Sequence, residues 1–150
     1  MRKYFYNLSF SYKTQDETEK ICSHFNIGYF SSKLKAQEVI GQLKGKPGFC
    51  EYPLDCFILR KQAVYFSRNV FSKEAVTLYN LTHEYMLEDY CLTNVWTDFG
   101  LFESREAAIC ELNKQSQKRP YKNYPNGFYI DEWHVNRDIQ WQEGFTHANA

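Results

Sequence analysis

The chain contains an internal duplication, and this feature constrains the fold more than any other. When the sequence is shifted by 72 places, much of the segment 28–53 falls on similar residues of the segment 100–125. Downstream of a one-residue deletion, a shift of 71 places aligns residues 57–64 with residues 128–135. Upstream, a shift of 73 places aligns residues 6–12 with residues 79–85. Two copies of one structural unit are therefore expected. Identical pairs include Gly28 and Gly100, Phe30 and Phe102, Ser32 and Ser104, Ala36 and Ala108, Tyr52 and Tyr124, Pro53 and Pro125, and Phe57 and Phe128.

A single copy is short for an independent domain, because a chain of that size buries too little apolar surface. Residues 1–68 and 74–145 are therefore predicted to be two repeats packed as one compact unit. Hydrophobic residues make up 43% of the chain and aromatic residues 18%, which excludes a disordered protein. No apolar run approaches the roughly 20 residues of a membrane span. Residues 1–12 lack the apolar stretch of a signal peptide, so a cytoplasmic location is expected.

Both copies show the order strand, strand, helix, strand. Ser32 and Ser104 stand where a helix N-cap is needed, and Gly28 inside a strand pattern indicates a β-bulge or a close backbone approach. Hydrophobic periodicity predicts strands over 3–12, 25–30, 55–66, 75–85, 95–102 and 127–135, and helices over 33–44 and 105–116.

These elements predict an α+β protein in which two ββαβ repeats form a pseudo-two-fold, mainly antiparallel sheet with two helices on one face. Residues 138–145 have no counterpart in the first copy. Trp141 and Phe145 are expected to anchor this tail to the rest of the protein.

The net charge of zero conceals a difference between the two halves. Residues 1–73 contain 12 Lys and Arg against 6 Asp and Glu, a charge of +6, whereas residues 74–150 contain 6 against 12, a charge of −6. Two opposite halves attract one another, which is one explanation. The other is that one face binds a charged macromolecule.

The second copy also carries a recognisable set of short motifs. They are Gly100, Phe102 and Ser104, then Ala108 in the helix, Tyr124-Pro125-Asn126-Gly127-Phe128, Ile130-Asp131-Glu132 and Trp141-Gln142-Glu143-Gly144-Phe145. In this pattern the chain resembles a small uncharacterised bacterial domain, present here as a tandem, diverged pair. The first copy lacks the Asn-Gly turn and the closing Trp-Gly-Phe element. No activity is known for this family, so the resemblance implies an architecture and no catalytic residues.

The residue types needed for catalysis or metal binding do not occur at useful spacings. Cys22-x-His24 and Cys50-x5-Cys56 lack a second ligand pair, and the five cysteines of a chain without an export signal are expected to be free thiols. Adjacent Asp131 and Glu132 point to opposite faces of a strand. We therefore predict that the protein is not an enzyme and uses no metal or cofactor.

Protein recognition is the function that the remaining residues favour. Tyrosine and tryptophan are rigid anchors at interfaces, and carboxylates around them suit a partner with a basic surface. The prediction is an immunity-protein-like, antitoxin-like or other inhibitor of bacterial or phage origin. Its binding surface, called the acidic face below, is predicted to comprise Glu84, Tyr85, Glu88, Asp89, Tyr90, Trp96, Asp98 and Glu103.

Two alternatives remain open. One is nucleic-acid binding, in which lysines and arginines of the first copy neutralise phosphates and nearby aromatic rings stack on bases. The other is a small-ligand sensor with an aromatic pocket between the repeats. The basic face of the first alternative comprises Lys33, Lys35, Lys44, Lys46, Arg60 and Lys61.

Overall fold

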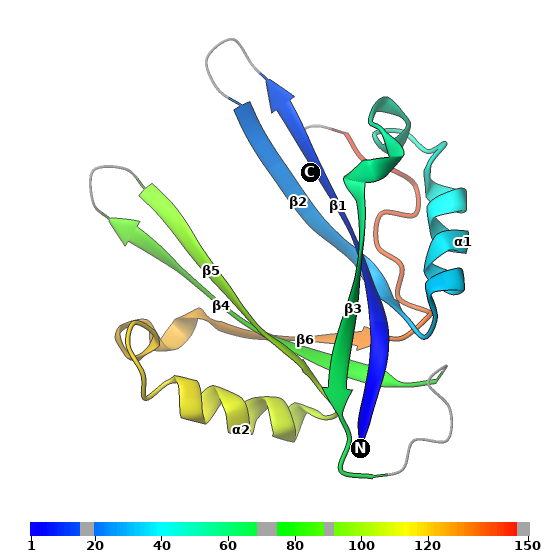
Figure 1. The fold of residues 1–150 in the computed structure, drawn as a ribbon. Coiled ribbons are helices and arrows are strands. Elements are labelled where there is room, and N and C mark those ends of the chain that lie inside the picture. Colours follow the sequence, from blue (N-terminus) through cyan, green and yellow to red (C-terminus); the bar gives the residue numbers. More distant parts are fainter. Residues whose placement is uncertain (16–19, 69–74, 89–91, 147–150) are drawn as a thin grey trace. The chain divides into compact units, whose positions relative to one another are not determined.

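The computed structural model describes residues 1–15, 20–68, 75–88 and 92–146. The predicted order strand, strand, helix, strand is confirmed in both copies (Figure 1). The first copy contains β1 (Arg2–Gln15), β2 (Lys20–Phe30), α1 (Lys33–Leu43) and β3 (Phe57–Tyr65). The second contains β4 (Thr77–Glu88), β5 (Leu92–Phe102), α2 (Arg105–Gln115) and β6 (Phe128–His134). Two short 3-10 helices precede the last strand of each copy: Phe49–Glu51 and Leu54–Cys56, then Tyr121–Asn123 and Pro125–Gly127.

The described strands form two antiparallel three-stranded sheets, in the orders β2-β1-β3 and β5-β4-β6. This confirms the α+β class and the two-fold repeat. In each sheet the central strand pairs on both edges with strands of its own copy. The helix caps are confirmed: Ser32 Oγ accepts from the Lys35 amide at 3.2 Å, and Ser104 Oγ from the Ala107 amide at 3.1 Å.

The predicted β-bulge is present, and it occurs in both copies. Leu8 pairs with Gly28 but Ser9 pairs with Asn26, so β2 holds one extra residue opposite this step. The same shift places Leu81 opposite Gly100 and Thr82 opposite Asp98. Each bulge therefore marks an equivalent point of the two hairpins.

A buried asparagine stabilises each bulge. Asn7 Nδ2 donates to Asn26 Oδ1 and to the Gly28 carbonyl. Asn80 Nδ2 donates to Asp98 Oδ1 and to the Gly100 carbonyl, both at 2.9 Å. Since a buried amide without partners is costly, these bonds fix the hairpin register as well as the bulge.

The strand β1 is more deeply buried than its alternating sequence suggested. Alternation of polar and apolar residues is typical of a strand with one face in solvent, but Asn7 and Ser9 are buried along with Leu8 and Phe10. The reason is its place as the central strand of its sheet, where the Asn7 side chain forms hydrogen bonds within the hairpin.

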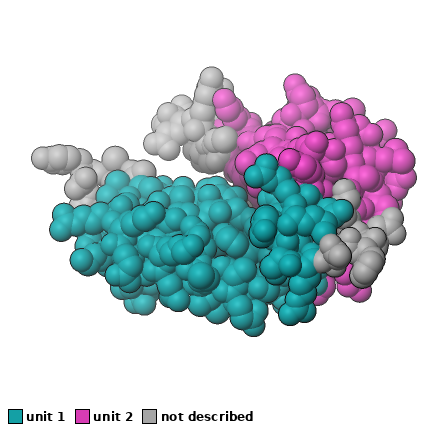
Figure 2. Space-filling view, turned by 60° about the horizontal axis from the view of Figure 1, so that its bottom comes forward, with its two compact units in different colours: residues 1–3, 63–71, 77–133 teal, residues 4–62, 72–76, 134–150 magenta. Residues whose placement is uncertain are grey.

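The chain forms two compact units whose limits differ from those of the repeats (Figure 2). Unit 1 comprises residues 1–3, 63–71 and 77–133, and unit 2 comprises residues 4–62, 72–76 and 134–150. The end of each copy therefore belongs to the unit built around the other copy. Predicted packing of the repeats into one compact body stays a prediction. No helix in the described chain has the length and apolarity required to cross a membrane.

Unit 2 is built around an aromatic cluster. The ring of Phe10 lies edge-on to Phe49 and to Phe57, with both centroids 4.9 Å away. Phe25 and Tyr12 pack around the same ring. Ala36, Val39 and Leu43 bury the inner face of α1 against this cluster.

The tail, residues 136–145, completes the core of unit 2. Phe145 is 3% exposed, and its ring centroid lies 4.9 Å from Phe49, 5.1 Å from Phe25 and 5.2 Å from Tyr12. Trp141 packs on Phe25 at 4.8 Å. Both expected anchors therefore contact the core of the first copy.

Backbone hydrogen bonds attach the tail to the free edge of β2. The amide of Asn136 donates to the Tyr29 carbonyl at 2.9 Å, and that of Gln140 to the Ile27 carbonyl at 2.8 Å. The Phe145 amide donates to the Pro47 carbonyl at 2.9 Å. In Figure 1 the tail, coloured orange to red, accordingly runs between β2 and α1. Gly144 has a φ of 90° and its backbone touches Pro47, so a side chain there has no space.

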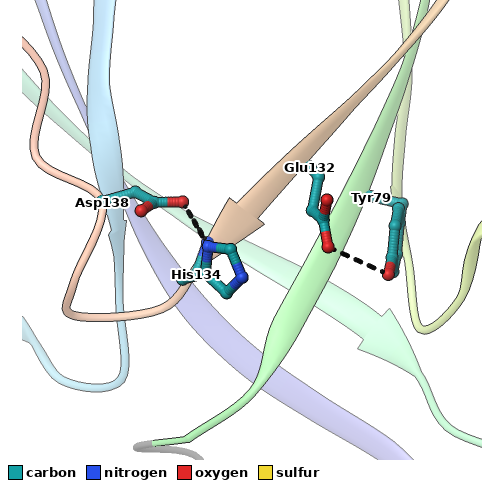
Figure 3. A network of polar contacts seen from close by, with 4 residues as sticks. All are labelled: Tyr79, Glu132, His134 and Asp138. Carbon is teal, nitrogen blue, oxygen red and sulfur yellow. Dashed lines mark hydrogen bonds and ion pairs between the residues drawn. The ribbon is translucent and has the colours of Figure 1, made fainter.

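A tight turn directs the chain from β6 into the tail. The Asp138 carboxylate accepts from the His134 amide at 2.6 Å and contacts the His134 ring at Nδ1, at 2.8 Å (Figure 3). Partial burial of Asp138 opposes ionisation, but the two bonds from His134 and the charge of Arg137 outweigh it. The pKa of this carboxyl is therefore held below its ordinary value.

Replacing Phe145 with alanine should destabilise unit 2. The change leaves a cavity in a core of aromatic rings, and buried Phe→Ala substitutions cost about 3–5 kcal/mol. Denaturant unfolding, followed by tryptophan fluorescence, measures the loss. Tyr65→Ala is the matched control, because Tyr65 is 70% exposed. Equal stability of the two variants would contradict a core role for the tail.

Asp138→Asn should weaken the turn in a pH-dependent way. Because the folded pKa of Asp138 is depressed, its contribution is complete above the unfolded value of about 3.9 and is lost as the pH falls through the folded value. The difference in unfolding free energy between wild type and variant should therefore be constant at pH 6 to 7 and shrink below about pH 4. A difference that persists unchanged at pH 2 would contradict this role of the charge.

Candidate partner-binding site

The sheet of unit 1 brings three residues of the predicted acidic face together. Glu84 of β4 pairs directly with Trp96 of β5, and two residues further along the hairpin Thr82 pairs with Asp98. Side chains of directly opposed residues lie on the same side of a sheet, and alternate residues share that side. Glu84, Trp96 and Asp98 therefore lie on one face of the hairpin.

Large aromatic side chains are exposed on this unit. Trp96 is 58% exposed and Tyr129, on β6, is 54% exposed. Trp96 lies opposite Glu84, while Tyr129 and Glu84 line one pocket. An exposed tryptophan and an exposed tyrosine beside a carboxylate are typical of binding surfaces.

Three other predicted residues have structural roles. Asp98 Oδ1 accepts from Asn80 and from the Gly100 amide at 2.8 Å, so it stabilises the bulge. Glu103 accepts from the amide and the hydroxyl of Ser67. Tyr85 lies on the other side of the sheet from Glu84, where its ring stacks on Tyr124.

The remaining members of the predicted acidic face are not placed. The side chain of Glu88, together with Asp89 and Tyr90, lies outside the described residues. Their participation stays a prediction. Among the described members, Glu84 and Trp96 are the two whose side chains have no evident structural task.

A pocket of about 340 Å³ opens beside Glu84, and it is called the Glu84 pocket below. Tyr85 and Tyr124 are among its lining residues, and their rings stack with centroids 4.4 Å apart and planes at 22°. Its lining is formed by Glu84, Tyr85, Asn123, Tyr124, Pro125, Asn126, Gly127 and Tyr129.

The loop that lines the Glu84 pocket is fixed against β4 at Gly127. A Cβ atom at this position would lie 2.5 Å from the Glu84 carbonyl oxygen and 2.7 Å from His83 Nε2. Only glycine allows such an approach. This explains the glycine of the Tyr-Pro-Asn-Gly-Phe motif, and it holds Tyr124 and Tyr129 in place on either side of the loop.

Sequence reasoning missed Tyr124, Pro125 and Tyr129 as site residues. The signal was available in the duplication. The first copy has the same tyrosine pair, Tyr12 and Tyr52, at a centroid distance of 4.6 Å. At the positions of Glu84 and Tyr129, however, it has Ser11 and Ile58. The tyrosine pair therefore belongs to the common scaffold, and the carboxylate and the exposed ring are specific to the second copy.

The residues of the predicted basic face are spread over unit 2. Lys33 and Lys35 begin α1, whereas Lys44 and Lys46 follow its end, about 16 Å away for a helix of 11 residues. Arg60 and Lys61 are neighbours on β3, so their side chains point to opposite faces. Lys61 also lies over the Tyr4 ring at 4.6 Å. The geometry does not gather these six residues on one continuous strip.

Other polar groups of unit 1 are engaged within the fold. The Tyr79 hydroxyl donates to Glu132 at 3.3 Å, and partial burial together with this carboxylate raises the pKa of Tyr79 (Figure 3). His83 is fully buried, and its Nε2 contacts the Tyr124 carbonyl at 2.8 Å. Since a carbonyl only accepts, Nε2 carries the proton in this bond. Within the described ranges, no three His, Cys, Asp or Glu residues are grouped as metal ligands would be.

Comparison of the chain with models of protein families, with curated proteins and with solved structures finds no match.

Proposed function

We propose that this protein binds another protein through Trp96, Tyr129 and Glu84, and that it acts as an immunity-protein-like or antitoxin-like inhibitor. The observation that carries the proposal is the exposure of two large aromatic rings next to a carboxylate on a rigid sheet. Burying such rings supplies binding free energy, because interface hot spots are rich in Trp and Tyr. Their attachment to strands keeps the entropic cost of ordering low.

Charge determines which partner suits this surface. Residues 74–150 carry a net charge of −6, so a partner with a basic surface is attracted at long range and oriented before contact. Proteins that act on nucleic acids have such surfaces. An inhibitor of this kind covers a basic site, and it needs no catalytic group of its own.

Trp96→Ala should weaken partner binding about 30-fold, because truncation of a hot-spot tryptophan costs about 2 kcal/mol or more. The partner is isolated from the native cell with the wild-type protein as bait and identified by mass spectrometry. Calorimetry then compares wild type and variant. Tyr65→Ala is the control for loss of an exposed aromatic ring. An unchanged affinity of Trp96→Ala would contradict the proposed surface.

Reversal of three charges, Glu84→Lys, Glu88→Lys and Asp89→Lys, should slow association and make binding less sensitive to salt. Association rates at several salt concentrations measure the effect. The matched measurement is binding of wild type to RNA and DNA at low salt. Nucleic-acid binding that is abolished by Lys33→Glu and Lys35→Glu, with no effect of the acidic substitutions on any partner, would favour the basic face instead.

A further inference from the structure

We infer that the free edge of β5 in unit 1 binds an extended, basic segment of the protein partner. β5 is an outer strand of its sheet, and among the described strands it pairs only with β4. An edge strand carries backbone amides and carbonyls that can bind a further extended segment, and many proteins recognise peptides in this way. The inference rests on the proposed function for the statement that the segment belongs to a protein partner.

The first copy shows the equivalent edge with its occupant. There the tail lies along β2, and the Gln140 amide donates to the carbonyl of Ile27, the extra residue of the bulge, at 2.8 Å. The extra residue of the second bulge is Phe99. Outside the β4–β5 hairpin, no described residue donates a hydrogen bond to Phe99. The second copy therefore keeps the acceptor, and the described chain supplies no donor for it.

The space that the tail fills in the first copy is open in the second. A Cβ atom at Gly28 would lie 2.5 Å from the Asp138 carbonyl oxygen of the tail, whereas a Cβ atom at Gly100 would have nothing within 4 Å. The aromatic rings differ in the same sense. Phe49 is 1% exposed, but Tyr121, which stands at its position in the second copy, is only half-buried.

Apart from its bulge, β5 lacks the features that usually keep an edge strand from pairing. It is 11 residues long and contains no lysine, arginine or proline. Its one carboxylate, that of Asp98, is engaged at the bulge. Just beyond the strand, Glu103 binds Ser67. The part of the edge that is open to a partner therefore runs from Phe99 toward the turn of the hairpin.

The neighbouring helix indicates the charge of the segment. In the first copy, Ile139 precedes the donating residue and lines one cavity with Val39 and another with Leu43, both on α1. The second copy has Glu111 and Gln115 at these two helix positions. A lysine or arginine in the place of Ile139 would meet a carboxylate there, in a half of the chain that carries a net charge of −6. The segment is therefore expected to have a basic residue directly before its donating residue.

The test is an NMR titration of the full-length, ¹⁵N-labelled protein with a synthetic peptide of residues 137–145 that carries Ile139→Lys. This peptide retains the donor of the tail and supplies a lysine for Glu111. It should shift the amide signals of residues 98–101 in a saturable way, in the millimolar range. The signals of residues 26–29 should not move, because the tail covers that edge. Unmoved signals of residues 98–101, or displacement of the tail, would overturn the inference.

N-methylation of Gln140 in the peptide should abolish binding, because it removes the donor to Phe99. N-methylation of Gln142 is the matched control, since the Gln142 amide forms no hydrogen bond in the described part of the chain. If both modifications weaken the peptide equally, the proposed pairing with the edge of β5 is wrong.

Glu111→Gln should weaken binding of this peptide about threefold, as expected for loss of an exposed ion pair, and should leave binding of the unsubstituted peptide unchanged. Glu106→Gln is the control, because it removes a negative charge from the first turn of the same helix. An equal effect of the two substitutions would overturn the assignment of a basic residue to this position.

Sedimentation equilibrium and hydrogen exchange of the protein alone test the other occupant, a second copy of the chain. The protein should be monomeric, with amides of residues 98–101 that exchange more slowly only when the partner is added. A dimer in which these amides are already protected would assign the edge to a second copy and overturn the inference.

These results are separable from those for the proposed function. If Trp96→Ala weakens the protein partner but the peptide does not bind, the proposed function stands and the edge site is wrong. If the peptide binds at β5 and depends on the Gln140 amide, but no partner protein depends on Trp96 or Glu84, the edge site stands and the proposed function is wrong.

Discussion

Insertion of Phe145 among the rings of Phe10, Tyr12, Phe25 and Phe49 is the contact on which unit 2 depends. Without it, a cluster of aromatic rings would face solvent on one side. The rest of the tail positions this ring. Hydrogen bonds to the carbonyl groups of Ile27, Tyr29 and Pro47 hold the tail backbone, and Gly144 permits the close approach of that backbone to Pro47. Burial of the Phe145 ring stabilises the unit through the hydrophobic effect. Hydrogen bonds to the edge of β2 fix the path of the tail.

The second copy has no such tail among its described contacts, and its side chains reflect this. His83 occupies the position of Phe10 and keeps the same edge-on contacts, at 4.8 Å from Tyr121 and 4.5 Å from Phe128. Further along, Glu111 and Gln115 replace Val39 and Leu43 and hydrogen-bond to each other at 2.8 Å. These helix positions are apolar in the first copy, where they belong to the core that Phe145 completes, and polar in the second copy, because exposed apolar surface is costly.

The local features of the fold could be predicted from the sequence. Ser32 and Ser104 identified both helix starts, and Gly28 identified the bulge, because each depends on a residue type with a specific backbone role. The division into two sheets could not be predicted, since the alternation of a strand does not say which strands are its neighbours. For the candidate site, Glu84 and Trp96 were found from charge and aromatic content. Tyr129 was missed because a tyrosine in a strand reads equally well as core.

The separation between Phe10 and Phe145 has a consequence for how the protein is made. During synthesis the first copy emerges from the ribosome long before residue 145 is added. The nascent first copy therefore contains the aromatic rings of the cluster but lacks Phe145, which completes it. Contacts across such a sequence distance form late, because the intervening chain must first be ordered. Completion of the first copy is therefore tied to completion of the second, and cutting the chain at the repeat boundary would not yield two proteins.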